Sequence, residues 1–316
     1  MIIVALCTGE IAAQGAYEVD VEAEYGLNNN PTLKAAIEKN TSALLRAMNR
    51  AADRRENINY SGINISPEAK QTLNDLWQGQ TMTYAAKENG YNIPLVGKVT
   101  KTQYGEWELR NIPMTFIDRN NTSDSHYEEI GINYNNQGQI EDVFVTIEKN
   151  QFQKILDGMT EVKDESNRYN ILYYMEAMKT AYERHNLDWF RQYLSNDVLV
   201  VTGSRRYTRT GETFEYRSSD KTEYLNRLST VFKRNPTIRV EFNDMTIIGH
   251  AMDDAGRYYA VECIQKWYST HYSDVGRLFI LWDFGRPEQP QILFRGWTEL
   301  DDPTRFNIYD MPVMLD

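Results

Sequence analysis

The chain has 316 residues, about twice the length of an average domain, so we expect two domains. It is 41% hydrophobic and 25% charged, an ordinary globular composition that excludes disordered and collagen-like proteins. Its 34 basic and 45 acidic residues give a net charge of -11, which argues against a nucleic-acid partner because phosphate backbones are repelled. Two cysteines exclude a disulfide scaffold and Cys-rich zinc modules.

The N-terminus has features of an export signal. It starts with an apolar run, and Ala13-Gln14-Gly15 supplies the small residues that precede a cleavage site. We therefore interpret residues 1–15 as a signal peptide and predict a secreted or periplasmic bacterial protein. Cys7 follows Leu6, where a lipoprotein signal has a small residue, so we expect no lipid anchor. No later window is long and apolar enough to predict a membrane span.

The first half of the chain changes from helical to strand periodicity. Residues 16–30 are acidic and then Asn-rich, which indicates an exposed lead-in. An apolar stripe from Thr32 onward predicts an amphipathic helix, and Ser66-Pro67 starts a second helix. From Trp107 the apolar residues alternate, which predicts strands that end in a hairpin turn at residues 135–138. We place this domain at residues 31–150.

The second half begins after a polar stretch at residues 151–168, which we interpret as a linker. We predict a domain at residues 169–302 and a C-terminal tail at residues 303–316. The periodicity predicts a helix through Tyr182, a short helix from Leu187, a strand at 198–201, a polar excursion at 205–220, a helix at 221–234, and strands at 237–248, 257–269, 276–284 and 291–300.

The two halves share one order of elements, with helices first and a strand meander after them. Helices packed against one face of a curved antiparallel sheet give an α+β fold. Two such units in tandem fit the length of the chain.

Three segments carry a resemblance to a known family. The start of the second half resembles the opening of the NTF2-like superfamily, also described as SnoaL-like or cystatin-like. The resemblance lies in the helix at Tyr173–Tyr182, the short helix start Asn186-Leu187-Asp188 and the acidic turn into a strand at residues 194–203. The closing strands at residues 272–284 and 291–297 resemble uncharacterised secreted proteins of gut bacteria. The resemblance implies two tandem cones, of which residues 31–150 would be a degenerate copy.

The resemblance also implies a cone-shaped pocket between helices and sheet, and dimers that form through the outer face of the sheet. Enzymes of this superfamily use a pocket Asp or His as a base with a Tyr or Asp as donor opposite it. Asp283 shares the alternation of Phe279 and Leu281, so it would face inward if they do, and Arg295 is its expected partner. Asp283 and Tyr182 are therefore candidate catalytic residues, although a carboxylate in the position of Asp283 more often belongs to a structural ion pair.

Other residues are candidates for ligand contact. Aromatic side chains at helical or strand spacing fit the lining of a cone, but they also fit an ordinary core. Glu262 and Gln265 lie on opposite faces of one strand, so at most one of them points inward. The ligand-binding candidates are Tyr182, Trp189, Tyr224, Gln265, Trp267, Arg295 and Trp297.

The four histidines give no sign of a metal site. His126, His185, His250 and His271 lack the spacing of zinc ligands, and no cysteine pair accompanies them. We expect neither a metal nor another cofactor.

Three functions remain open at this point. The first is a non-enzymatic protein that binds a small ligand or a protein partner. The second is an enzyme of the isomerase, dehydratase or hydrolase type that uses the pocket of the second domain. The third is a structural role, either as a homodimer or with the two cones packed as an internal pseudo-dimer.

Overall fold

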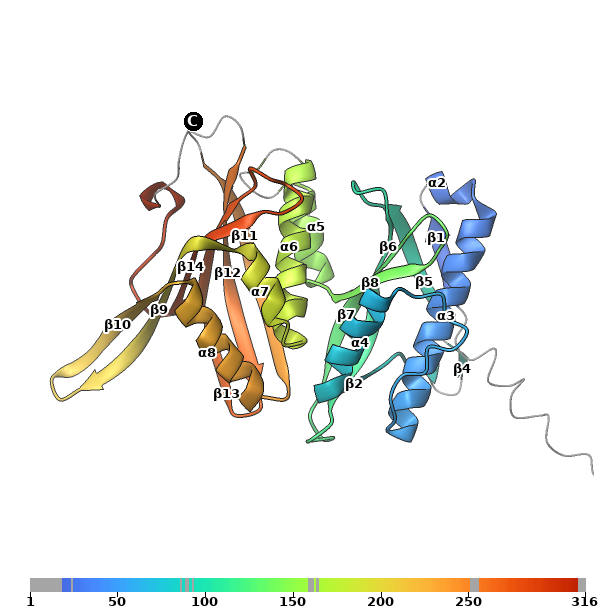
Figure 1. Cartoon of the computed structure of the whole chain (residues 1–316), viewed down its shortest axis with the longest axis horizontal. Coiled ribbons are helices and arrows are strands. Elements are labelled where there is room, and N and C mark those ends of the chain that lie inside the picture. The colour runs from blue at the N-terminus through green and yellow to red at the C-terminus, as the bar shows by residue number, and fades with distance from the viewer. Residues whose placement is uncertain are drawn as a thin grey trace, which may run out of the picture. The chain divides into compact units, whose positions relative to one another are not determined.

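A computed structural model describes residues 19–311, apart from 24, 86, 89–90, 93, 159–161, 163–164 and 251–255. The predicted signal peptide therefore lies outside the described residues. The chain divides into two compact units at Thr146 and Ile147, and each unit packs helices on a largely antiparallel sheet (Figure 1). Both units have the expected α+β class. No described helix is long and apolar enough to cross a membrane.

The first unit has a sheet in the order β1-β5-β6-β7-β8, with β2 paired to β6. Its elements are β1 (Val19–Ala23), α2 (Tyr25–Asn28), α3 (Pro31–Arg54), α4 (Pro67–Gly79), β2 (Gln80–Thr83), β3 (Lys87–Glu88), β4 (Tyr91–Asn92), β5 (Leu95–Lys101), β6 (Trp107–Asp118), β7 (Ser125–Tyr134) and β8 (Ile140–Val145). Asn30 and Ser66 cap α3 and α4 with their side chains, and a proline follows each cap.

The prediction that residues 16–30 form an exposed lead-in is wrong for the part that the structure describes. Val19 and Val21 are buried because β1 pairs in parallel with β5, and Leu27 is buried as well. The sequence alternation at these valines belongs to a real strand whose partner lies far along the chain.

The second unit has a sheet in the order β10-β9-β14-β13-β12-β11. Its elements are α5 (Lys149–Leu156), α6 (Glu165–Glu183), α7 (Leu187–Tyr193), β9 (Leu194–Thr208), β10 (Gly211–Ser219), α8 (Lys221–Arg234), β11 (Ile238–Gly249), β12 (Tyr258–Ser269), β13 (Tyr272–Asp283), β14 (Gln291–Glu299) and a 3-10 turn at Ile308–Asp310. The four long strands and α8 lie close to the predicted positions.

Two segments of this unit differ from the sequence expectation. The stretch 151–168, expected as a linker, contains most of α5 and the start of α6. The polar excursion at 205–220 is a long hairpin, in which β10 pairs with β9 from Gly211 to Ser219. Both faces of the hairpin are largely exposed, so its strands have no apolar alternation.

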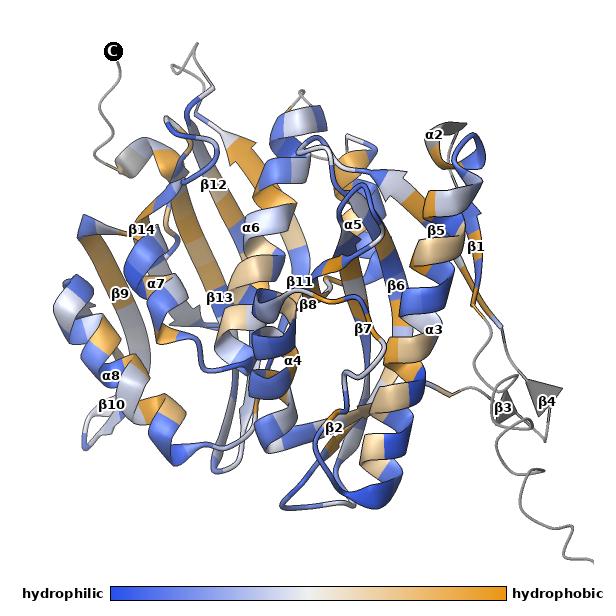
Figure 2. Ribbon diagram, turned by 45° about the vertical axis from the view of Figure 1, so that its right-hand side comes forward, coloured by the Kyte–Doolittle hydropathy of each residue, from blue (hydrophilic) through white to orange (hydrophobic). Residues whose placement is uncertain are grey.

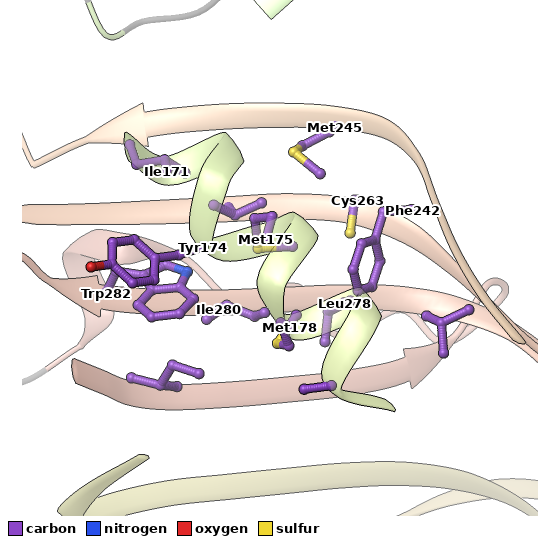
Figure 3. Packing of buried hydrophobic residues seen from close by; sticks show 14 of the residues in the cluster. Ile171, Tyr174, Met175, Met178, Phe242, Met245, Cys263, Leu278, Ile280 and Trp282 are labelled. Carbon is purple, nitrogen blue, oxygen red and sulfur yellow. The ribbon is translucent and has the colours of Figure 1, made fainter. Parts of the chain in front are cut away.

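The concave face of the second sheet is covered by α6. Ile171, Met175 and Met178 of this helix lie over Leu278 and Ile280 of β13 (Figure 3). The strands beneath the helix are rich in hydrophobic residues (Figure 2). This core is continuous with the aromatic side chains that surround the candidate site.

The outer face of the same sheet is covered by the C-terminal segment, not by solvent. Phe306 packs against Phe279 and Phe294, and Ile308 is buried in the same cluster. Asp302 is fully buried and accepts hydrogen bonds from the Tyr216 hydroxyl at 2.7 Å and from the Thr304 backbone N–H at 2.9 Å. The residues expected as a free tail, as far as Met311, are therefore part of the fold.

Phe306 lies directly over Gly296, and this contact gives a test of the outer layer. A methyl group at Gly296 would lie 2.3 Å from Phe306 Cε2. We expect Gly296→Ala to lower the free energy of unfolding by about 1–3 kcal/mol, because the ring must move. In a Phe306→Ala background the same substitution should cost much less. Equal penalties in both backgrounds, measured by urea unfolding, would contradict this packing.

Candidate functional site

The candidate site is a polar cluster on the concave face of the second sheet. Arg295 of β14 lies opposite Ile280, and Gln265 of β12 lies opposite Gly276, so both side chains point toward the helices. Arg295 Nη2 donates a hydrogen bond to Gln265 Oε1 at 3.1 Å. The guanidinium thus reaches across β13 to the next strand but one.

Gly276, opposite Gln265, leaves room on this face for the Trp297 ring. A methyl group at this position would lie 2.5 Å from the Trp297 ring and 2.4 Å from the Thr298 carbonyl oxygen. The Trp297 indole therefore lies close against the backbone of β13. It occupies the concave face beside Arg295, as the alternation along β14 requires.

Two tyrosines from different helices enclose the cluster. The hydroxyls of Tyr182 on α6 and Tyr224 on α8 are 2.8 Å apart. The Tyr224 ring centroid lies 5.7 Å from Arg295 Cζ, and the Tyr182 ring meets Trp267 edge to face at 5.4 Å. The predicted residues Tyr182, Tyr224, Gln265, Trp267 and Arg295 therefore converge at one place.

Trp189 lies to the side of this cluster. It meets Phe190 edge to face at a ring distance of 5.0 Å and Tyr193 in a tilted contact at 4.7 Å. Phe190 in turn contacts Tyr182, so Trp189 supports the site indirectly. Its packing is that of a core aromatic.

Arg295 is a buried cation without a carboxylate partner. Its side chain is 7% exposed, and a guanidinium remains charged at all ordinary pH values. Within the described residues it forms no ion pair, and its Nε has no hydrogen-bond partner. The Nε1 of Trp297 is also buried and unpartnered. Two buried N–H donors on the same face of β14 are thus left unsatisfied, a situation that native proteins avoid.

Burial disfavours the charged forms of three groups around Arg295. Burial raises the pKa of the Tyr182 hydroxyl and of the Cys263 thiol far above neutrality. Burial also raises the pKa of Asp274, although the Tyr272 hydroxyl and the charge of Arg295 oppose that shift. The cluster thus places the neutral Tyr182 hydroxyl near the permanent positive charge of Arg295, a combination whose chemistry suits an anion.

The expected pairing of Asp283 with Arg295 is wrong. Phe279 and Leu281 face the outer layer, and Asp283 is directed away from the concave cluster. Its two carboxylate oxygens accept hydrogen bonds from Arg257 Nε and Nη2 at 2.7 and 2.8 Å. Asp283 and the other catalytic candidate, Tyr182, consequently belong to different places in the second unit.

The sequence analysis missed two residues of the cluster. Asp274 lies opposite Trp267 at the start of β13, and one of its oxygens is buried without a partner. Arg227 follows Tyr224 by three residues, about one turn of α8, and its Nε is buried without a hydrogen-bond partner. The alternation Asp274, Gly276, Leu278 along β13 was a signal that could have indicated Asp274.

Metal ligands do not gather in the part of the chain that the structure describes. No group of three or more His, Cys, Asp or Glu side chains there is arranged to hold an ion.

The chain matches no family model and no curated protein. Solved structures similar to it include an NTF2-like protein from Cytophaga hutchinsonii, with 14% identity over 42% of this chain and 98% of that one and a TM-score of 0.33. A protein of the NTF2-like family from Streptomyces avermitilis, named as a dehydratase, has 11% identity over 42% and 94% at a TM-score of 0.33. Bd1075 of Bdellovibrio bacteriovorus has 11% identity and a TM-score of 0.33, with 51% of this chain aligned to about half of that protein (47%).

NTF2-like proteins thus stand among the structural neighbours of this chain, in agreement with the resemblance seen in the sequence. Nothing in these comparisons supports the gut-bacterial group, and at these TM-scores they carry no argument about function.

The Arg257–Asp283 pair predicts a pH-dependent contribution to stability. Burial alone would raise the pKa of Asp283, but Arg257 and the Gly285 N–H hold it below the usual value. We expect Asp283→Asn to destabilise the protein by about 1 kcal/mol at neutral pH, since the pair is partly exposed.

The same difference should be complete above about pH 5, begin to fall near pH 4, where Asp283 of the unfolded chain takes up a proton, and vanish only as the pH drops below the lowered pKa of the native carboxylate. Thermal unfolding of both proteins across this range is the measurement. A difference that persists undiminished at lower pH would contradict an electrostatic origin.

Proposed function

We propose that the second unit binds a small acidic ligand with a flat apolar body, and that Arg295 anchors its anionic group. The observation that supports this most directly is the buried guanidinium with an unpaired Nε beside the unpaired Trp297 Nε1. A carboxylate would accept from both donors and supply the missing charge, because charge-assisted hydrogen bonds to arginine are the strong ones. The rings of Trp267 and Tyr182 would contact the apolar part.

Access to Arg295 would come from the side of α8. Of the 14 residues of this helix, Leu228 and Phe232 are buried, so it is a lightly packed cover. Tyr224 is only partly buried and its ring lies over Arg295. Rotation of this side chain into solvent would break one hydroxyl contact and uncover the guanidinium.

Paired aromatic probes test this function. We expect naphthoate to bind the full chain and quench its tryptophan fluorescence. Uncharged naphthamide should bind at least about tenfold more weakly, since a charge-assisted hydrogen bond contributes about 1.5–3 kcal/mol. Arg295→Met should abolish the preference, and Trp189→Phe should retain it as the matched control. Equal binding of both probes, or an unchanged preference in Arg295→Met, would overturn the proposal.

The stability of Arg295→Met completes that experiment. Replacing an uncompensated buried cation by an apolar side chain is often neutral or stabilising, so we expect no loss of unfolding free energy beyond ~1 kcal/mol. A loss of about 3 kcal/mol or more would indicate a structural role for Arg295 instead.

An enzymatic use of the same cluster is the second candidate, and Asp274 is the observation that favours it. Its pKa is raised by burial, and Arg295 acts on it electrostatically, which is the environment of a tuned acid or base. Tyr182, held neutral, could donate a hydrogen bond opposite it. A bound ligand that is released chemically altered by the wild type, and unaltered by Asp274→Asn, would favour this alternative over binding alone.

We also infer that the protein is exported, on the strength of the apolar run and small-residue site in residues 1–15. Expression of the full chain in a bacterium should release a periplasmic protein whose N-terminal sequence begins at Ala16. Recovery of the intact N-terminus from the cytoplasm would contradict export.

A further inference from the structure

A second polar site lies in the second unit, apart from the Arg295 cluster. It is a cleft of about 500 Å³, a volume typical of small-molecule sites, and none of its lining residues belongs to that cluster. The lining comes from Asp283 and the loop after β13, the first residue of β14, the start of β9 and the first residue of α8. It contains no aromatic or aliphatic side chain.

The walls of the cleft are held by hydrogen bonds. Asp283 is fixed by Arg257 and by the Gly285 N–H at 2.8 Å. Gln291 Nε2 donates to the Gln192 carbonyl at 3.2 Å, which joins β14 to the end of α7. The Tyr174 hydroxyl donates a hydrogen bond to the Pro287 carbonyl at 3.2 Å and so holds the loop that joins β13 to β14. The site is therefore preorganised.

The cleft has an excess of positive charge. The charge of Arg257 is neutralised by Asp283. Lys221 Nζ donates only to neutral oxygens, at 2.7 Å to the Leu194 carbonyl and 3.2 Å to Asn196 Oδ1. The guanidinium of Arg286 forms no hydrogen bond or ion pair with any described residue.

Two cations thus remain uncompensated in one cleft of a protein with net charge -11. Clefts with one sign of charge concentrate ligands of the opposite sign.

We propose that this cleft binds a small hydroxylated anion, that is, a sugar carrying one carboxylate or phosphate group. Lys221 and Arg286 hold the acidic group, and the amides of Asn196, Gln289 and Gln291 hold the hydroxyls. Amide side chains both donate and accept, which suits hydroxyl groups, whereas an apolar ligand finds no surface here. The cleft and the Arg295 cluster would take ligands of different chemistry, and this inference does not depend on the proposed function.

Calorimetric titration of the full chain tests the inference with glucuronate, a hexose phosphate, glucose and inorganic phosphate. We expect one or both acidic sugars to bind, and glucose to bind about tenfold more weakly or not at all. The acidic sugar that binds more tightly identifies the acidic group as carboxylate or phosphate. Affinity should fall as salt is raised, because the cleft is open to solvent.

Variants locate the binding. Arg286→Gln and Lys221→Gln should each weaken it about tenfold. Arg286 lies in an exposed loop, so its variant keeps the test valid if Lys221→Gln fails to fold. Arg206→Gln, in an exposed pair with Glu215, is the matched surface control and should have no effect. Arg295→Met should also have no effect.

Several results would overturn the inference. These are equal binding of glucose and the acidic sugars, inorganic phosphate binding as tightly as the hexose phosphate, no binding of either acidic sugar, or unchanged binding in Arg286→Gln. Loss of binding in Arg295→Met would assign the ligand to the concave cluster and remove the cleft as a site.

Discussion

The second unit depends on how its sheet accommodates the charge of Arg295. A guanidinium taken out of water without a paired carboxylate is unfavourable by several kcal/mol, and the surrounding core must compensate. Here the compensation comes from the Gln265 amide, from the Tyr224 ring face and from the Tyr182 hydroxyl, which burial keeps neutral. None of these is an anion, and the carboxyl of Asp274 acts on Arg295 electrostatically without forming an ion pair with it, so the charge is not neutralised by a direct partner.

This arrangement requires both faces of the sheet to be covered. On the concave side, α6 supplies Met175 and Met178 and excludes water from β13. On the outer side, Phe306 lies over Gly296, while Gly276 on the opposite face lets the Trp297 ring reach the backbone. Side chains at either glycine would push an aromatic layer away from the sheet. The two layers together give the low-dielectric surroundings in which the charge of Arg295 acts strongly.

The same double coverage explains what the sequence could and could not predict. Residues 278–282 are apolar without interruption, because alternate side chains enter two different buried layers. A continuous apolar run carries no information about which residues face inward, so the placement of Asp283 could not be decided from it. Gln265 and Arg295 were recognised as candidates, but the choice between Glu262 and Gln265 stayed open and Arg295 was assigned to Asp283, because strand spacing does not show which polar side chains meet across the sheet.

Two other segments, the β9–β10 hairpin and the strand β1, were predicted wrongly for different reasons. The β9–β10 hairpin is exposed on both faces, so its polar sequence resembles a loop. The strand at Val19–Ala23 does alternate, but a parallel strand has no adjacent hairpin turn and its partner at Leu95 is distant in sequence. Local periodicity identified elements reliably where one face is buried and the other is wet, as in α8.

Arg257 and Arg295 have different surroundings, which suit a stabilising role for the first and a ligand-binding role for the second. Arg257 has a bidentate carboxylate in a partly exposed position, so its charge is already satisfied and a ligand gains little by approaching it. Arg295 has a neutral partner in a buried position, and the favourable interaction that it lacks is available to an incoming anion. Evolution of a fold for stability alone would favour the first arrangement or an apolar replacement of the second. An uncompensated cation beneath a lightly packed helix is the arrangement that the anionic ligand of the proposed function would complete.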